Sequence, residues 1–142
     1  MNLKVEKGIT VVKPADIANI INGFLEIADE VEKDREHLYA IGLNAKNVVI
    51  YAELVSMGTS NETPCSPKEI YRRACIHNAT NLILAHNHPS GVLTPSTQDI
   101  EVTQKVYKAG KILGITVVDH VIVNNEGDFH SLKASGLIKG DE

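Results

Sequence analysis

The chain has few cysteines and no pattern for a disulfide framework or a cysteine-based metal site. Only two of its 142 residues are cysteine, Cys65 and Cys75, and they lie ten positions apart without a CxxC spacing. Structural zinc sites usually take four ligands rich in cysteine, and disulfide-stapled domains need more cysteine pairs. We therefore expect two free thiols in a reducing cytoplasm.

The sequence also lacks the segments that would carry it into or across a membrane. It contains no uninterrupted apolar run long enough to span a bilayer, although 43% of its residues are hydrophobic. Residues 1–7 have neither the apolar core nor the small-residue cleavage site of a secretory signal. We expect a cytoplasmic protein with no membrane contact.

The sequence has too few clustered basic residues for a protein that binds nucleic acid directly. The net charge is −4, and the one basic cluster consists of Lys68, Arg72 and Arg73. DNA-binding surfaces normally present a basic face, because released counterions supply much of the affinity. The three basic residues fall broadly on one side of a predicted helix, which is typical of a solvated face. Direct DNA binding is not expected.

Length and hydrophobic pattern predict one α/β domain. A chain of this size matches a single domain, and it shows no internal repeat, low-complexity tract or linker. Predicted strands and helices are interspersed, so we expect a mixed sheet with helices packed on it. The expected strands are 8–12, 38–43, 48–55, 81–85, 115–123 and 128–132, and helices are expected to begin near Pro14, Ser66 and Ser96.

Three metal-ligand side chains lie in one short window. His86 and His88 follow the apolar run 81–85, and residues two apart on a strand point to the same face. Asp99 comes after ten further residues, past a proline-containing loop and at the start of a helical pattern. Two histidines and one aspartate leave the fourth position of a tetrahedral zinc ion for water, as in catalytic sites. The pattern predicts one zinc ion per chain.

The spacing of these residues resembles a known signature. His-x-His, ten residues and Asp is the pattern of the JAMM metalloproteases, which are JAB/MPN domains. The run 84–99, with Gly114, the segment 119–122 and Gly127 downstream, is similar to the bacterial RadC-like branch of that family. The resemblance extends over about residues 11–137.

The resemblance implies both a fold and an activity. The fold would be a JAB/MPN domain of the cytidine-deaminase-like type, with residues 1–142 as one domain and a core at about 11–137. The activity would be that of a zinc-dependent metalloprotease or isopeptidase. Its substrate would be a peptide or protein, including a ubiquitin-like tail.

A hydrolase of this kind needs a carboxylate beside the metal, but not on it, to move protons. The family has a glutamate on a strand ahead of the histidine pair, and Glu53 in the segment 52–59 matches that place. Glu62 and Glu69 remain competitors, although Glu62 falls in a polar loop and Glu69 is expected to cap a helix. The charged run 29–36 is interpreted as a connector. Glu53 is the predicted general base.

Ser96 and His120 have two possible roles each. Ser96 occupies the family's Ser-x-x-Asp position, where a hydroxyl is expected to stabilise a developing oxyanion. Ser-x-x-Asp at a helix start is equally a capping arrangement, in which Ser96 accepts a backbone N–H near Asp99. His120 follows Asp119 in an apolar strand, as in the family, and this pair is expected either to support the metal ligands or to position the core.

Two other classes of function remain open. RadC-like proteins carry a name that links them to DNA repair, so a role with nucleic acid or repair partners is the first alternative. Larger family members carry a helix-hairpin-helix module thought to touch DNA, and the roughly forty residues ahead of the first strand pair do not match it. We therefore expect a standalone domain. A metal-free interaction scaffold is the second alternative, and the sequence carries no signal for the oligomeric state.

Overall fold

The computed structural model describes residues 2–3, 8–26, 34–57 and 66–138. In this part of the chain, six strands form one sheet in the order β1-β3-β2-β4-β5-β6. The elements are β1 (Asn2–Leu3), α1 (Pro14–Glu26), β2 (His37–Leu43), β3 (Val49–Met57), α3 (Pro67–Ile76), β4 (Asn81–Asn87), α4 (Thr97–Leu113), β5 (Thr116–Val123) and β6 (Phe129–Ser131). The predicted α/β class with a mixed sheet is confirmed.

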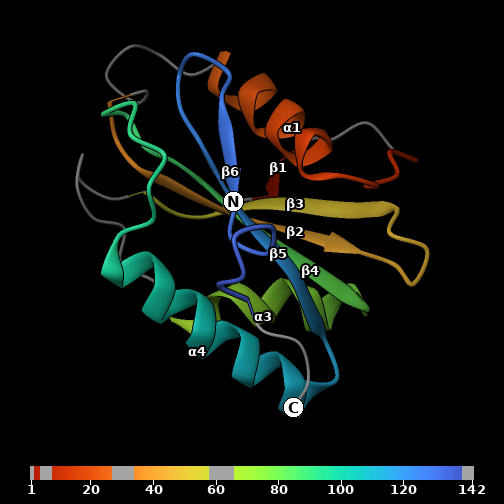
Figure 1. Cartoon of the computed structure of the whole chain (residues 1–142). Helices are drawn as coiled ribbons and strands as arrows, with labels where there is room; N and C mark the ends of the chain where they lie inside the picture. The colour runs from red at the N-terminus through yellow and green to blue at the C-terminus, as the bar shows by residue number, and fades with distance from the viewer. Residues whose placement is uncertain (1, 4–7, 27–33, 58–65, 139–142) are drawn as a thin grey trace.

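The sheet is mixed because one strand pair is parallel. β4 and β5 run in the same direction, whereas the other neighbouring pairs are antiparallel. A parallel pair needs a crossover connection, and α4 supplies it. Figure 1 shows α1 on one face of the sheet and α3 and α4 on the other. Among the described residues, no helix is long and apolar enough to cross a bilayer.

The alternation of side chains along the strands divides the core into two layers. Residues on one face pack beneath α1, and their neighbours in the chain pack beneath α3 and α4. In the first layer, Ile17 and Ile21 of α1 pack with Ile41, Ile83 and Val121 of the sheet. In the second, Ile70 of α3 and Val106 of α4 pack with Leu38 and Leu84. The sheet is therefore buried on both faces, which explains why its central strands are almost continuously apolar.

The segment 8–12 does not form the predicted strand. Its one bridge joins Thr10 to Val48, and the chain then turns into α1. The Asp16 carboxylate ends the extended segment early, because it accepts the backbone N–H groups of Val12 and Lys13 at 2.8 and 3.0 Å.

The end of α4 follows the prediction. The helix stops at Leu113, and Gly114 takes a left-handed conformation with φ 77°.

β4 brings the predicted ligands to one end of the strands of the sheet. Six of its seven residues are buried, and it lies between β2 and β5. His86, near its carboxyl end, is opposite Leu38 of β2 and Ile122 of β5. Because α4 must cross back to start the parallel strand β5, the amino end of α4 lies near the carboxyl end of β4. Ligands in α/β proteins commonly bind at this end of the strands.

Two helical glycines provide a matched test of the packing. A Cβ at Gly110 of α4 would meet the Ile115 carbonyl oxygen and the Tyr71 hydroxyl, whereas a Cβ at Gly23 of α1 would meet nothing within 4 Å. We expect Gly110→Ala to lower the free energy of unfolding by about 1–3 kcal/mol through overpacking. Gly23→Ala should raise it by up to about 1 kcal/mol through helix propensity. Urea unfolding followed by circular dichroism measures both, and the reverse order would contradict the packing.

Candidate metal centre

The three predicted ligand side chains meet at the carboxyl end of β4. His86 Nε2 lies 2.8 Å from His88 Nε2, and the two oxygens of Asp99 lie 3.2 Å from His86 Nε2 and 3.1 Å from His88 Nε2. Both histidines are buried, and Asp99 is partly buried. The structure thus assembles a two-histidine, one-aspartate group that could hold a metal ion.

Backbone pairing and helix capping place these three residues. His86 belongs to β4, and the backbone N–H of His88 continues the parallel pairing by donating to Val123 O at 2.8 Å. Asp99 is the third residue of α4, where its carboxylate accepts the backbone N–H of Ser96 at 2.8 Å. Each ligand is therefore held by local secondary structure as well as by its neighbours.

The donor set fits a zinc ion. Zinc bonds of about 2.0–2.1 Å at tetrahedral angles place ligand atoms about 3.3 Å apart. The two Nε2 atoms lie 2.8 Å apart, about half an ångström less than that value. Asp99 approaches His86 Nε2 with Oδ1 at 3.2 Å and His88 Nε2 with Oδ2 at 3.1 Å, and one ligand atom from each residue lies within 4.8 Å of the others. The Nδ1 atom of His88 donates to Val92 O at 2.7 Å, so a neutral His88 has its lone pair on Nε2, facing the other two ligands. Imidazole nitrogen with carboxylate oxygen is a common zinc donor set.

The electrostatics of the centre favour a positive charge. Burial is the largest influence on Asp99 and would raise its pKa, but the adjacent His86 and His88 side chains outweigh it and hold the pKa well below the usual range. Burial alone would lower the pKa of His88, yet Asp99 and the Val92 carbonyl raise it above its ordinary value. An ionised aspartate beside a histidine that attracts a proton is also an attractive place for a cation.

A second carboxylate lines the centre, and it belongs to Glu36. Its Oε1 atom lies 4.0 Å from His88 Nε2, and its side chain is only 10% exposed. Glu36 also shares a hollow of about 20 Å³ with His86, Ser96 and Asp99. That is room for about one water-sized particle. Glu36 is therefore beside the three ligand side chains, where a proton-transfer group would be needed.

Asn87 explains how Glu36 reaches the centre. The Asn87 side chain accepts the backbone N–H of His37 at 2.6 Å and donates to the Arg35 carbonyl at 3.0 Å. These two bonds clamp the residues on either side of Glu36 to the end of β4. Sequence reasoning missed Glu36 because it assigned the run 29–36 to a connector. The signal that could have found Glu36 was its position just before β2. This strand is antiparallel to β4 and begins beside the carboxyl end of β4.

The structure places Glu53, the predicted base, away from the ligand side chains. Glu53 pairs with Ala40, which in turn pairs with Leu84, so it lies two strands away from β4 and below the level of His86. Its Oε2 atom lies 3.4 Å from Arg73 Nε of α3. This ion pair joins β3 to α3 on the face that carries the centre, but it is displaced from the ligand side chains.

The two competing glutamates do not replace it. Glu69 forms an exposed ion pair with Arg72 at 2.7 Å on α3. Glu62 lies outside the described residues. Of the carboxylates that the sequence singled out as bases, none in the described part of the chain lines the hollow of the metal centre.

Ser96 takes the capping arrangement and also lines the hollow. Its Oγ accepts the backbone N–H of Asp99 at 3.0 Å, which completes a capping box with the Asp99 carboxylate. Accepting this bond uses a lone pair of the hydroxyl oxygen and leaves its proton available for a further acceptor. The two predicted roles of Ser96 are therefore compatible.

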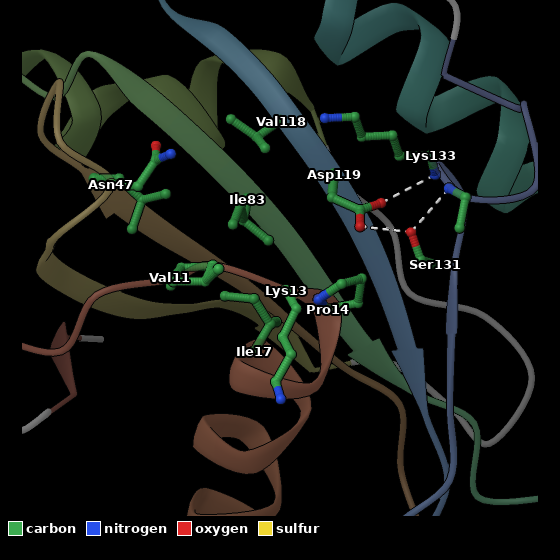
Figure 2. A pocket seen from close by; sticks show the side chains of 13 residues that line it. Val11, Lys13, Pro14, Ile17, Asn47, Ile83, Val118, Asp119, Ser131 and Lys133 are labelled. Atoms are coloured by element: carbon green, nitrogen blue, oxygen red, sulfur yellow. Dashed lines mark hydrogen bonds between the residues drawn. The ribbon is translucent and has the colours of Figure 1, made fainter.

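Asp119 and His120 point to opposite faces of the sheet. Asp119 accepts from Ser131 Oγ at 2.6 Å and from the backbone N–H of Lys133 at 3.0 Å, so it ties the end of β6 to β5. Figure 2 shows these bonds at the rim of a cavity of about 450 Å³ on the α1 side, which Val11 and Ile17 also line. His120 faces the metal centre instead, with Nε2 at 2.6 Å from His86 Nδ1. Burial and the nearby His86 lower the pKa of His120 well below its usual value.

Removing one ligand tests the centre directly. We expect the purified protein to carry close to one zinc ion per chain, and His86→Ala to lose it, because two ligands bind zinc far more weakly than three. His77→Ala is a matched control, since His77 is exposed at the end of α3. Elemental mass spectrometry after gel filtration measures the metal content. Equal zinc in His86→Ala and wild type would contradict this assignment.

Comparison with known proteins identifies the family of this chain. The RadC-like JAB domain family matches residues 11–137. The UPF0758 protein of Desulforudis audaxviator is 50% identical over 104 residues, which cover 73% of this chain and 45% of that protein. The UPF0758 protein of Desulforamulus reducens is 42% identical over 125 residues, covering 88% and 52%. The chain spans about half the length of these curated relatives. It belongs to the RadC-like JAB domain family.

Proposed function

We propose that this domain is a zinc-dependent hydrolase that cleaves a peptide or isopeptide bond. The observation that carries the proposal is the buried Glu36 carboxylate, 4.0 Å from the nearest ligand nitrogen of the His86, His88 and Asp99 group. A structural metal site needs only its ligands, and it is normally closed by four of them. Three ligands with an adjacent carboxylate are the set that a hydrolytic reaction requires.

The three ligands would hold zinc through the two Nε2 atoms and the Asp99 carboxylate. When bound, zinc supplies a Lewis acid that polarises a carbonyl group and makes a water molecule more acidic. The protein has to supply the remaining chemistry. Hydrolysis of an amide requires a group that removes a proton from water and a group that delivers one to the leaving nitrogen.

Glu36 is placed to move both protons. Its carboxylate is close to the ligand group without belonging to it, with Oε1 at 4.0 Å from His88 Nε2. Burial of its side chain limits access of bulk water, so a proton taken from the nucleophile stays available for the leaving group. We assign Glu36 the general acid–base role that the sequence had suggested for Glu53.

Ser96 would stabilise the negative charge that develops on the substrate oxygen. The capping bond from Asp99 N fixes its Oγ at the wall of the hollow, and the hydroxyl proton remains free to donate. A hydrogen bond to a developing oxyanion can lower a reaction barrier by about 3–4 kcal/mol. Because the cap pre-positions the hydroxyl, little rearrangement would be needed during the reaction.

The geometry does not favour a nucleic-acid function. Of the three basic residues on α3, Arg72 forms an ion pair with Glu69 and Arg73 forms one with Glu53. Guanidinium groups paired with carboxylates contribute less to a phosphate-binding surface. A peptide or protein substrate therefore remains the proposal.

Two isosteric variants test whether Glu36 or Glu53 is the base. Glu36→Gln should keep its zinc, because Glu36 is not a ligand, and should lower kcat by about 10²–10⁴-fold. Glu53→Gln removes the charge that pairs with Arg73, away from the ligand group, and should keep most of the activity. The substrate for both assays is a peptide library from a proteome digest, with new termini counted by mass spectrometry.

The control is the zinc content of each variant, measured on the same samples. An active Glu36→Gln together with an inactive Glu53→Gln would return the base role to Glu53. If the zinc-loaded wild type cleaves neither the library nor an isopeptide-linked ubiquitin-like conjugate, the proposed peptide or isopeptide hydrolysis fails.

A further inference from the structure

We propose that Thr103 and His120 are positioning residues that hold His86 in the tautomer a metal ion requires. The inference rests on the proposed metal centre and concerns side chains behind it. Thr103 is 1% exposed and His120 is 2% exposed, so both are sealed from water. Neither is a member of the ligand group.

The direction of the hydrogen bonds begins with Thr103. This residue lies one helical turn after Asp99 on α4, and its hydroxyl donates to the Asp99 carbonyl at 2.6 Å. A carbonyl oxygen can only accept, and a hydroxyl has a single proton. The second contact of Thr103 Oγ1, at 2.6 Å from His120 Nδ1, must therefore be a bond that His120 donates.

The tautomer of His120 then determines that of His86. A neutral His120 with its proton on Nδ1 has a lone pair on Nε2, which lies 2.6 Å from His86 Nδ1. His86 must donate this bond, so its own proton is on Nδ1. The lone pair of a neutral His86 is consequently on Nε2, the atom that faces His88 and Asp99.

The opposite tautomers of His120 and His86 would prevent His86 from binding a metal ion. If Thr103 did not accept from Nδ1 of His120, that ring could carry its proton on Nε2 and donate to His86. A neutral His86 would then carry its proton on Nε2, where a metal ion has to bind. The Thr103 hydroxyl thus determines, through His120, whether Nε2 of His86 has a lone pair for a metal ion. Partners of this kind commonly set the orientation and basicity of metal-bound imidazoles.

The same hydroxyl also couples two ligands to each other. Through the Asp99 carbonyl it holds the first turn of α4, and through His120 it holds the ring of His86 on β4. The backbone N–H of His120 donates to the Asp119 carboxylate at 2.7 Å, which helps to hold β5 at this point. The helix, the two strands and the ligand atoms are therefore joined by a single chain of bonds.

Thr103→Val tests the inference, because valine has nearly the same shape but neither donates nor accepts. Nitrogen-15 NMR of the histidine rings in metal-free protein reports which nitrogen carries the proton. We expect Nδ1 for His86 in the wild type and a substantial Nε2 population in Thr103→Val. Competition with a chromophoric chelator should show zinc affinity falling by about 10- to 100-fold in the variant.

Two further variants separate positioning from general loss of structure. Thr103→Ser keeps the hydroxyl and should restore both the tautomer and the zinc affinity. Thr116→Val removes an exposed hydroxyl at the start of β5, at the end of the strand away from the centre, and should change neither. Thermal unfolding of each metal-free variant shows whether it is folded.

A proton on Nε2 of His86 in the neutral wild-type ring would overturn the inference without any variant. An unchanged tautomer and unchanged zinc affinity in folded Thr103→Val would also overturn it. Failure of the wild type to bind zinc would count against the proposed hydrolase instead. The tautomer of metal-free His86 would still decide the roles of Thr103 and His120.

Discussion

The parallel pairing of β4 with β5 is the constraint on which the rest of this structure depends. Because the two strands run in the same direction, the chain must return across the sheet between them, and α4 is the element that returns. The carboxyl end of β4, the amino end of α4 and the side chain of His120 consequently lie close together. His86 of β4, His88 just beyond its end and Asp99 of α4 meet there, and His120 packs behind His86.

The alternation of side chains along β4 gives neighbouring residues different tasks. His86 and His88 turn toward α4 and offer nitrogen atoms to a cation, while Asn87 between them clamps the backbone around Glu36. The clamp explains why a residue from a charged run, more than fifty positions earlier in the chain, lies beside the ligands. The candidate site for metal binding and proton transfer is thus built around three consecutive residues at one strand end.

Local structural roles and chemical roles coincide at the start of α4. Asp99 completes a capping box and faces both histidines, and Ser96 caps the helix while its hydroxyl lines the hollow. Thr103 makes an ordinary bond to the carbonyl four residues earlier, yet the same oxygen orients His120. The hydrogen bonds that stabilise the start of this helix therefore also position the side chains of the site.

The sequence by itself determined the α/β class, the helix starts at Pro14 and Pro67, and the candidate ligand group, because these depend on spacing within single elements and their ends. It did not place Glu36 beside that group, and it left His120 without a defined contact. These depend on strand order: β2, not β3, adjoins β4, so the residue before β2 reaches the ligands. Only the tertiary structure decided this, because hydrophobic alternation shows which face a side chain takes but not which strand lies next to it.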